Sequence, residues 1–220
     1  MKRVILVWLL CLAPMAFAEE PKSVATFEGV VERTISTPEG SANAQYLIKG
    51  KKTRINIETK AGKQSLLVDM QARQVTKLMP EKKSYLTMEV PDIKKTDDEK
   101  GAALKKTGKT QLLLGKSCEE WIYKSSKQKV VIWAVPGLGE FMGMTNEIRQ
   151  AEAWMGMVKE KNLFPVKVTS QDGTGKTVFS MEVTKMTEKA MPDDPFDIPK
   201  DYQKMDLSTL LLQGQAAEKK

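Results

Sequence analysis

"AQYLIKGKKTRINIE" spans residues 44–58, and its apolar and polar side chains alternate on both sides of a short turn. Gly50-Lys51 separates two segments of strand length, 44–50 and 52–58. In the second segment Ile55 and Ile57 face one way, and the polar side chains around them face the other way. This alternation predicts two antiparallel strands in a sheet with one apolar and one polar face.

The same period of two continues on both sides of this hairpin. Residues 26–36 form a long candidate strand interrupted by Gly29, and residues 91–106 are expected to be a charged loop with some helix. About ten strands are expected in all, and a sheet of that size curls or closes because twist accumulates from strand to strand. The remaining candidate strands are 64–70, 73–80, 83–90, 107–115, 118–126, 127–135, 164–172 and 176–186.

Residues 136–162 are the best helical segment. Apolar residues recur there at helical spacing, which predicts a helix with one apolar face. We expect a lid from about Leu138 to Val158, hinged at Pro136 and Gly137, although most helices of this kind are fixed in the core. The apolar face consists of Met144, Ile148, Ala151, Met155 and Val158.

The ends of the chain predict export. Residues 1–18 combine two cations, an apolar run and a small-x-small site, which is typical of a cleaved signal peptide and indicates a periplasmic location. Residues 19–204 are expected to form a single mainly β domain with some α structure. Residues 205–220 are expected to be a tail with a short helix around 207–212.

Composition argues against enzymatic chemistry. The chain has no histidine, so it lacks the usual general base, metal ligand and partner of a nucleophile. Cys118 is the one cysteine that remains after processing, and Glu119 and Glu120 beside it would raise its thiol pKa, as expected of a structural cysteine. We predict no catalytic residue, no metal site and no cofactor. The formal charge of +7 is spread along the chain and predicts no nucleic-acid site.

"TGKT" occurs at 107–110 and again at 174–177, and Gly-Lys-Thr also ends the loop that binds nucleotide phosphates. That loop needs an earlier glycine, but Ala103 and Ser170 occupy those positions. Strand-like runs follow both copies, whereas a helix follows a phosphate loop. We therefore predict no nucleotide site, and turns before or between strands instead.

The sequence has 13 methionines, including two Met-Gly-Met pairs in the helical segment. Thioethers bind Cu(I), so copper binding is a remote alternative. Helical geometry separates the sulfurs of each pair, which favours ordinary core packing or an adaptable wall for a flexible apolar ligand. Trp121 and Tyr123 share one face of their strand, as Val131, Trp133 and Val135 do on theirs, and these aromatics line either a core or a cavity.

The order of several motifs resembles the exported proteins grouped as domain of unknown function 4412, which look related to the LolA-like and LppX-like fold. The resemblance covers about residues 24–204. The motifs are "YLIKGKKTRI" (46–55), "LLVDMQARQVTKLMPEKKSY" (66–85), "TGKTQLLLGKSCEEWIY" (107–123), "VVIWAVPGLG" (130–139), "GTGKTVFSMEVTKM" (173–186) and "DDPFDIPKDY" (193–202).

This resemblance implies a curved half-barrel of antiparallel strands whose concave apolar face is covered by helices. Members of the wider superfamily carry lipids or lipoprotein acyl chains through the periplasm. The carrier proper gates its cavity with an arginine, and Arg54 is a candidate for that role only through its position in an early strand.

The resulting hypothesis is a non-enzymatic periplasmic protein that binds an amphipathic lipid or an acylated protein in an apolar concavity, with transient contact to an anionic membrane surface. The alternative is a scaffold with a solid core that binds a protein partner. The oligomeric state stays open. The expected cavity and lid residues are Ile55, Ile57, Trp121, Tyr123, Trp133, Met144, Ile148 and Met155.

Overall fold

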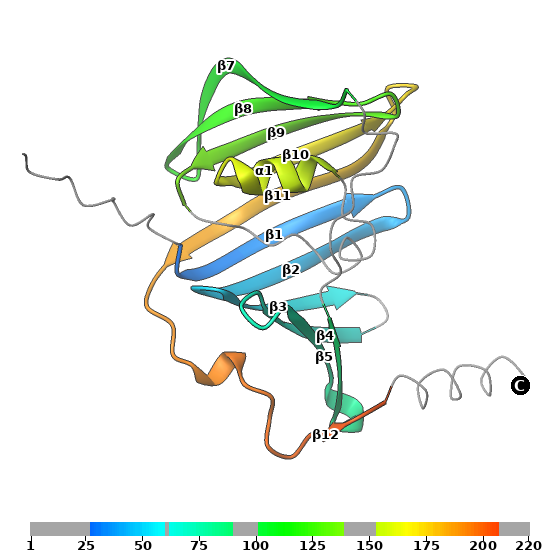
Figure 1. Cartoon of the computed structure of the whole chain (residues 1–220), viewed down its shortest axis with the longest axis vertical. Helices are drawn as coiled ribbons and strands as arrows, with labels where there is room; N and C mark the ends of the chain where they lie inside the picture. Colours follow the sequence, from blue (N-terminus) through cyan, green and yellow to red (C-terminus); the bar gives the residue numbers. More distant parts are fainter. Residues whose placement is uncertain (1–26, 60–61, 90–100, 139–152, 207–220) are drawn as a thin grey trace, which may run out of the picture.

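One sheet of twelve strands organises the chain in the computed structural model, which describes residues 27–59, 62–89, 101–138 and 153–206 of 220 (Figure 1). The sheet is antiparallel except where β12 pairs with β6. The strands and helices are β1 (Gly29–Thr37), β2 (Gly40–Lys49), β3 (Lys52–Thr59), β4 (Gly62–Asp69), β5 (Gln74–Met79), η1 (Pro80–Lys82), β6 (Ser84–Glu89), β7 (Ala103–Leu113), β8 (Lys116–Lys124), β9 (Gln128–Pro136), α1 (Ala153–Glu160), β10 (Leu163–Asp172), β11 (Thr177–Glu188), η3 (Asp194–Phe196) and β12 (Gln203–Lys204).

Two meanders meet at the centre of this sheet. β1 to β6 follow one another on one side, β7 to β11 follow one another on the other, and β1 pairs with β11. β7 and β12 are the two edge strands, so the sheet is open (Figure 1). The prediction of a large antiparallel sheet is confirmed.

The two faces of the sheet differ as the opening hairpin predicted. Ile55 of β3 pairs with Tyr46 of β2, and Ile57 pairs with Ala44, so these four side chains lie on one face. We call this the core face, and its largest fully buried side chains include Val31, Tyr46, Ile55, Val68, Val75, Tyr123, Val130, Ile132 and Val168. The opposite side of β1–β4 is the polar face, which carries Glu32, Asn43, Gln45, Arg54, Asn56 and Ser65.

Helix α1 packs on the core face. Trp154 and Val158 are one helical turn apart and both are buried, which places them on the side of α1 that faces the sheet. Beyond the helix, Lys161 lies over the ring of Trp121, with Nζ 5.4 Å from the ring centroid. The C-terminal part of the predicted helix is therefore present; it lies beside β10 (Figure 1) and also contacts β7.

The predicted start of that helix at residue 136 is wrong. Pro136 is the last residue of β9 and pairs with Leu163 of β10, and Gly137 turns the chain with φ +78°. Residues 130–135 favour a strand, and they pair with β10. Strand β9 therefore continues into the first residue of the segment 136–162 that was predicted to be helical. Met144, Ile148 and Ala151 lie outside the described residues.

The two "TGKT" copies have different structures. The copy at 174–177 lies in the β10–β11 turn, as predicted, where Gly175 has φ +84° and Asp172 Oδ1 accepts hydrogen bonds from the backbone N–H groups of Thr174 and Lys176. The copy at 107–110 was predicted to be a turn before a strand, and this is wrong, because it lies inside β7. The register of β7 shifts there, and Gly108 with φ +88° supplies the bulge. Likewise residues 103–106 belong to β7 rather than to a loop.

A segment that we call the C-terminal strap, residues 189–206, runs from the end of β11 to β12 at the sheet edge (orange in Figure 1). It contains η3 and the buried Phe196. It ends with Gln203 N–H donating to Lys83 O at 2.9 Å and Met205 N–H donating to Tyr85 O at 2.8 Å. The expectation of a proline-rich extended segment is confirmed only in part, because η3 occupies Asp194–Phe196 at its start. The predicted helix around 207–212 lies outside the described residues.

Candidate functional site

A buried arginine interrupts the apolar core face. Strand β1 places Val31, Arg33 and Ile35 in succession on that face, and Arg33 is 2% exposed. The guanidinium carbon of Arg33 lies 4.2 Å from the ring centroid of Tyr46, which is itself fully buried. Burying a cation among aliphatic side chains is unfavourable without compensating contacts, and the face of an aromatic ring supplies one such contact.

The residues that pair directly with Arg33 across the strands are aliphatic. Its cross-strand partners are Ala44 of β2 and Val183 of β11, and Ala44 also pairs with Ile57 of β3. Since residues that pair directly lie on the same face, Arg33 shares an apolar surface with the predicted residues Ile55 and Ile57. A planar guanidinium in such surroundings suits a carboxylate or phosphate, because it presents five N–H donors and stays charged.

The other predicted site residues are distributed as follows. Trp121 and Tyr123 of β8 pair with Ile132 and Val130, so both lie on the core face. Trp133 of β9 pairs with Glu120, which alternates with Trp121, and therefore lies on the opposite face.

The remaining predicted site residues are the three of the expected lid, Met144, Ile148 and Met155. Met155 is half-buried in α1 and packs against the core, whereas Met144 and Ile148 fall outside the described residues. Ile55, Ile57 and Tyr123 belong to one buried core, and Trp121, Met155 and also Trp133 are partly buried and pack against it. Sequence reasoning missed Arg33, although the alternation of Val31, Arg33 and Ile35 placed a charge on an apolar face.

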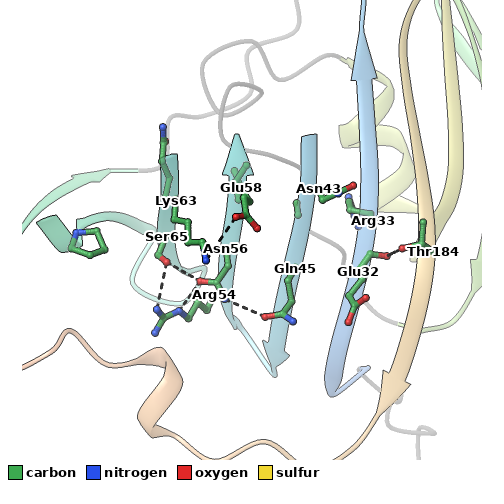
Figure 2. A pocket seen from close by; sticks show the side chains of 14 residues that line it. Glu32, Arg33, Asn43, Gln45, Arg54, Asn56, Glu58, Lys63, Ser65 and Thr184 are labelled. Carbon is green, nitrogen blue, oxygen red and sulfur yellow. Dashed lines mark hydrogen bonds and ion pairs between the residues drawn. The ribbon is translucent and has the colours of Figure 1, made fainter. Parts of the chain in front are cut away.

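A pocket of about 720 Å³ lies over the polar face of β1–β4 (Figure 2). Its floor is a hydrogen-bonded chain of polar side chains: Asn56 Oδ1 accepts from Arg54 Nε at 3.0 Å and from Ser65 Oγ at 2.8 Å, and Asn56 Nδ2 donates to Gln45 Oε1 at 3.3 Å. The charged lining residues are Glu32, Arg33, Arg54, Glu58 and Lys63. Arg33 alternates with Glu32 along β1 and is buried on the core face. The remaining charges of the lining, Glu32, Arg54, Glu58 and Lys63, balance and favour no charged ligand.

Arg54, the sequence candidate for a gating arginine, lies on the polar face. Its Nη1 group donates a hydrogen bond to Pro195 O of the strap at 3.2 Å. The arginine on the apolar face is Arg33, so Arg54 does not face the region where an apolar ligand would lie. Arg54 instead holds the strap against β3.

Cys118 is fully buried, and its Sγ lies 3.6 Å from Lys116 O. Burial raises the pKa of the Cys118 thiol above its usual value, because the thiolate would be poorly solvated. The direction agrees with the sequence prediction, but the cause is burial and not the neighbouring carboxylates. This thiol is suited to packing and not to nucleophilic chemistry.

The described part of the chain lacks both a metal-binding cluster and a helix that could span a membrane. No group of three or more His, Cys, Asp or Glu side chains there is arranged to hold a metal ion. Within the same residues, no helix has both the length and the apolar character needed to cross a bilayer.

Several solved structures are similar to this chain. An uncharacterized conserved protein from Thermus thermophilus is 11% identical, with a TM-score of 0.49, over 81% of this chain and 90% of its own. A chain of the Pseudomonas aeruginosa MucA/MucB complex is 8% identical, with a TM-score of 0.49, over 78% of this chain and 56% of its own.

A putative outer membrane lipoprotein-sorting protein domain from Vibrio parahaemolyticus is 8% identical, with a TM-score of 0.24, over 80% of this chain and 91% of its own. No curated protein matches the sequence. The family model described as "Domain of unknown function (DUF4412)" matches residues 27–202, which include every described strand except β12. The chain therefore belongs to the DUF4412 family.

Proposed function

We propose that this protein is a non-catalytic, periplasmic binding protein that takes up an amphipathic ligand, a lipid or a lipoprotein acyl chain, against the core face of its sheet. The observation that carries the proposal is Arg33, a buried cation that stacks on Tyr46 and whose cross-strand partners, Ala44 and Val183, are aliphatic. An amphipathic ligand combines an acyl chain, which matches the core face, with an acidic head group, which matches the guanidinium. The signal-like residues 1–18 support the periplasmic location.

The energetics of such binding are favourable without any chemical step. Each methylene group transferred from water to an apolar surface contributes about 0.8 kcal/mol. A carboxylate or phosphate that meets Arg33 away from bulk water interacts more strongly than it would in solvent. Sequence composition supports a non-catalytic role, because the chain contains no histidine.

The β9–β10 connection supplies a candidate lid. It leaves the sheet at Gly137 and returns at Asn162, and Gly137 N–H donates a hydrogen bond to Asn162 O at 3.0 Å. Both residues have positive φ, +78° and +51°, so the chain turns sharply at each end of the connection. The hydrogen bond between the two ends keeps β9 and β10 paired, and α1 is the described part of the connection that would move off the core face.

The proposal is tested with the mature protein and a fluorescent fatty acid. Native mass spectrometry and organic extraction should detect bound lipid, and the purified protein should bind the fatty acid. Arg33→Met should weaken this binding about tenfold or more, because it removes the charge and keeps the apolar surface. Arg73→Met removes an arginine from an exposed turn and serves as the matched control, with unchanged binding. A protein that carries no lipid and takes up no fatty acid contradicts the proposal.

A second function, a module that binds a protein partner around a solid core, is favoured by one observation. Many core-face side chains, including Tyr46, Ile55 and Tyr123, are already almost fully buried. If the core is filled in solution, the fatty acid does not bind and the hydrogen exchange of core-face amides is unchanged by lipid. That pair of results selects the second function over the first.

A further inference from the structure

We propose that the β7–β8 hairpin end docks on an anionic lipid bilayer. We call residues 112–116, "LLLGK", the leucine tip. This inference concerns a surface away from Arg33 and stands whether or not the core face takes up a ligand.

The leucine tip exposes apolar side chains to solvent. Leu112, near the end of β7, is 71% exposed, and Leu114, in the turn that follows, is 43% exposed. Among the residues that the structure describes, these two are the exposed large hydrophobic side chains. Leu113 between them points the other way and packs against the core, so alternation holds the two exposed leucines outward. Two exposed leucines close together at one hairpin end are typical of an interaction site.

The backbone at the leucine tip is an unfavourable one for leucine. Leu113 pairs with Lys116, which leaves a two-residue turn of Leu114 and Gly115, with φ +50° and +72°. Positive φ at both central positions is the geometry that favours Asn-Gly. A bulky side chain rarely adopts this conformation, yet Leu114 is presented there to solvent. A strained, exposed leucine is best explained by a function at that point.

The charge of the hairpin matches an anionic surface. Residues 103–124 contain five lysines and two glutamates, a net charge of +3. Lys106 and Lys109 pair with Glu119 and Glu120 at 2.8 and 3.4 Å, but the two lysine side chains stay 46% and 71% exposed. Lys116, in the leucine tip itself, pairs with Glu188 at 3.7 Å and is 30% exposed, and Lys109 lies three residues before Leu112. Lysines near exposed leucines attract anionic head groups while the leucines enter the acyl boundary.

The position of the hairpin leaves it accessible. β7 forms the edge of the sheet opposite to β12 (Figure 1). Edge strands can also pair with a second copy of the chain. The bulge at Gly108 and the three lysines of β7 interrupt a regular edge, which disfavours strand pairing and favours a membrane as the partner.

The test uses the mature full-length protein and sedimentation with vesicles. Wild-type protein should bind vesicles of phosphatidylcholine mixed with phosphatidylglycerol, and bind vesicles of phosphatidylcholine alone much more weakly. Raised salt should reduce the binding, because screening weakens attraction between exposed charges. The double variant Leu112→Ser, Leu114→Asn should bind the anionic vesicles about tenfold more weakly or worse.

The choice of Leu114→Asn keeps the test independent of folding. Asparagine suits the two-residue turn better than leucine does, so the melting temperature of the single variant Leu114→Asn should be equal to or above that of the wild type. Lys109→Gln should weaken vesicle binding, whereas Lys127→Gln, in the β8–β9 turn at the other end of the hairpin strands, is the charge-matched control.

Three results would overturn the proposal. The first is a wild-type protein that ignores anionic vesicles or binds neutral vesicles equally well. The second is a folded double variant that binds as the wild type does. The third is a wild-type dimer that Leu114→Asn converts to a monomer, since the leucine tip would then be a contact between two copies of the chain.

Discussion

Arg33 and Tyr46 lie face to face on neighbouring strands, with the guanidinium carbon 4.2 Å from the centroid of the tyrosine ring. Both side chains are buried on the core face, and the cross-strand partners of Arg33 are the aliphatic Ala44 and Val183. The contact explains how a cation is tolerated there, because a desolvated guanidinium gains from stacking on an aromatic ring. It also places a fixed positive charge where the proposed ligand would lie.

Replacing Arg33 with lysine tests this contact. Lysine keeps the charge but cannot stack as a plane, and an ammonium is more strongly hydrated. We expect Arg33→Lys to lower the free energy of unfolding by about 1–2 kcal/mol. Arg73→Lys in an exposed turn is the control, with no measurable change. Urea denaturation measures both variants, and equal stability of the two would show that stacking contributes little.

Gly29 begins β1 in close contact with the end of β11. Its φ is +148°, and a Cβ atom there would lie 2.1 Å from the carbonyl oxygen of Thr187. Since that neighbour is backbone, it cannot rotate away, and Gly29→Ala should destabilise the protein by about 3 kcal/mol or more. Gly175→Ala is the matched control, because a Cβ atom at Gly175 meets open space and only the cost of positive φ remains, about 1 kcal/mol. Thermal denaturation that ranks the two variants equally would contradict this account.

The strands were predictable because their information is local. Ile55 and Ile57 alternate with polar residues, and this alternation alone orients both faces of β3. The helix start was not predictable in the same way. Pro136 belongs to β9 because it pairs with Leu163 of β10, a residue 27 positions further along the chain. Pairing between distant segments leaves no local pattern to read.

The candidate site shows the same limit. In the sequence, Trp121 shares a strand face with Tyr123, and Trp133 shares one with Val131 and Val135. Each tryptophan was therefore expected to line a core or a cavity. Only the register of β8 with β9, in which Trp121 pairs with Ile132, places the two rings on opposite faces. Arg33 could have been found from the sequence, because it takes the place of an apolar residue in the alternation of β1.

The C-terminal strap should loosen in acid. Lys49 hydrogen-bonds Asp193 at 2.8 Å and lowers the pKa of that carboxyl, and Lys83 does the same for Asp201. A carboxyl whose pKa is lower in the folded state than its usual 3.8 stabilises the fold above that value, and the stabilisation is lost as pH falls through the folded pKa. The pKa of Lys83 is raised by its hydrogen bond to Asp201, so its contribution is present below pH 10.5 and is lost above the raised value.

Hydrogen exchange of the Gln203 and Met205 amides measures this loosening, after correction for the intrinsic pH dependence of exchange. Both amides donate to the strand β6 region at neutral pH. Their protection should fall below about pH 3.8, while the amides of β1 keep theirs. Asp201→Asn should show reduced protection already at neutral pH. Protection that is identical in acid and at neutral pH would show that these ion pairs do not hold the strap.

Cys118 should react slowly with alkylating reagents in the folded protein. Its thiol is fully buried, and burial raises the thiol pKa, so both access and the thiolate fraction are low. We expect iodoacetamide to modify the native protein about a hundredfold more slowly than the urea-unfolded protein at the same pH, because reaction requires opening of β7 from β8. Mass spectrometry of timed samples gives both rates. Rapid modification of the native protein would mean that the β7–β8 edge opens readily, and the rate would then also report on how firmly the leucine tip is held.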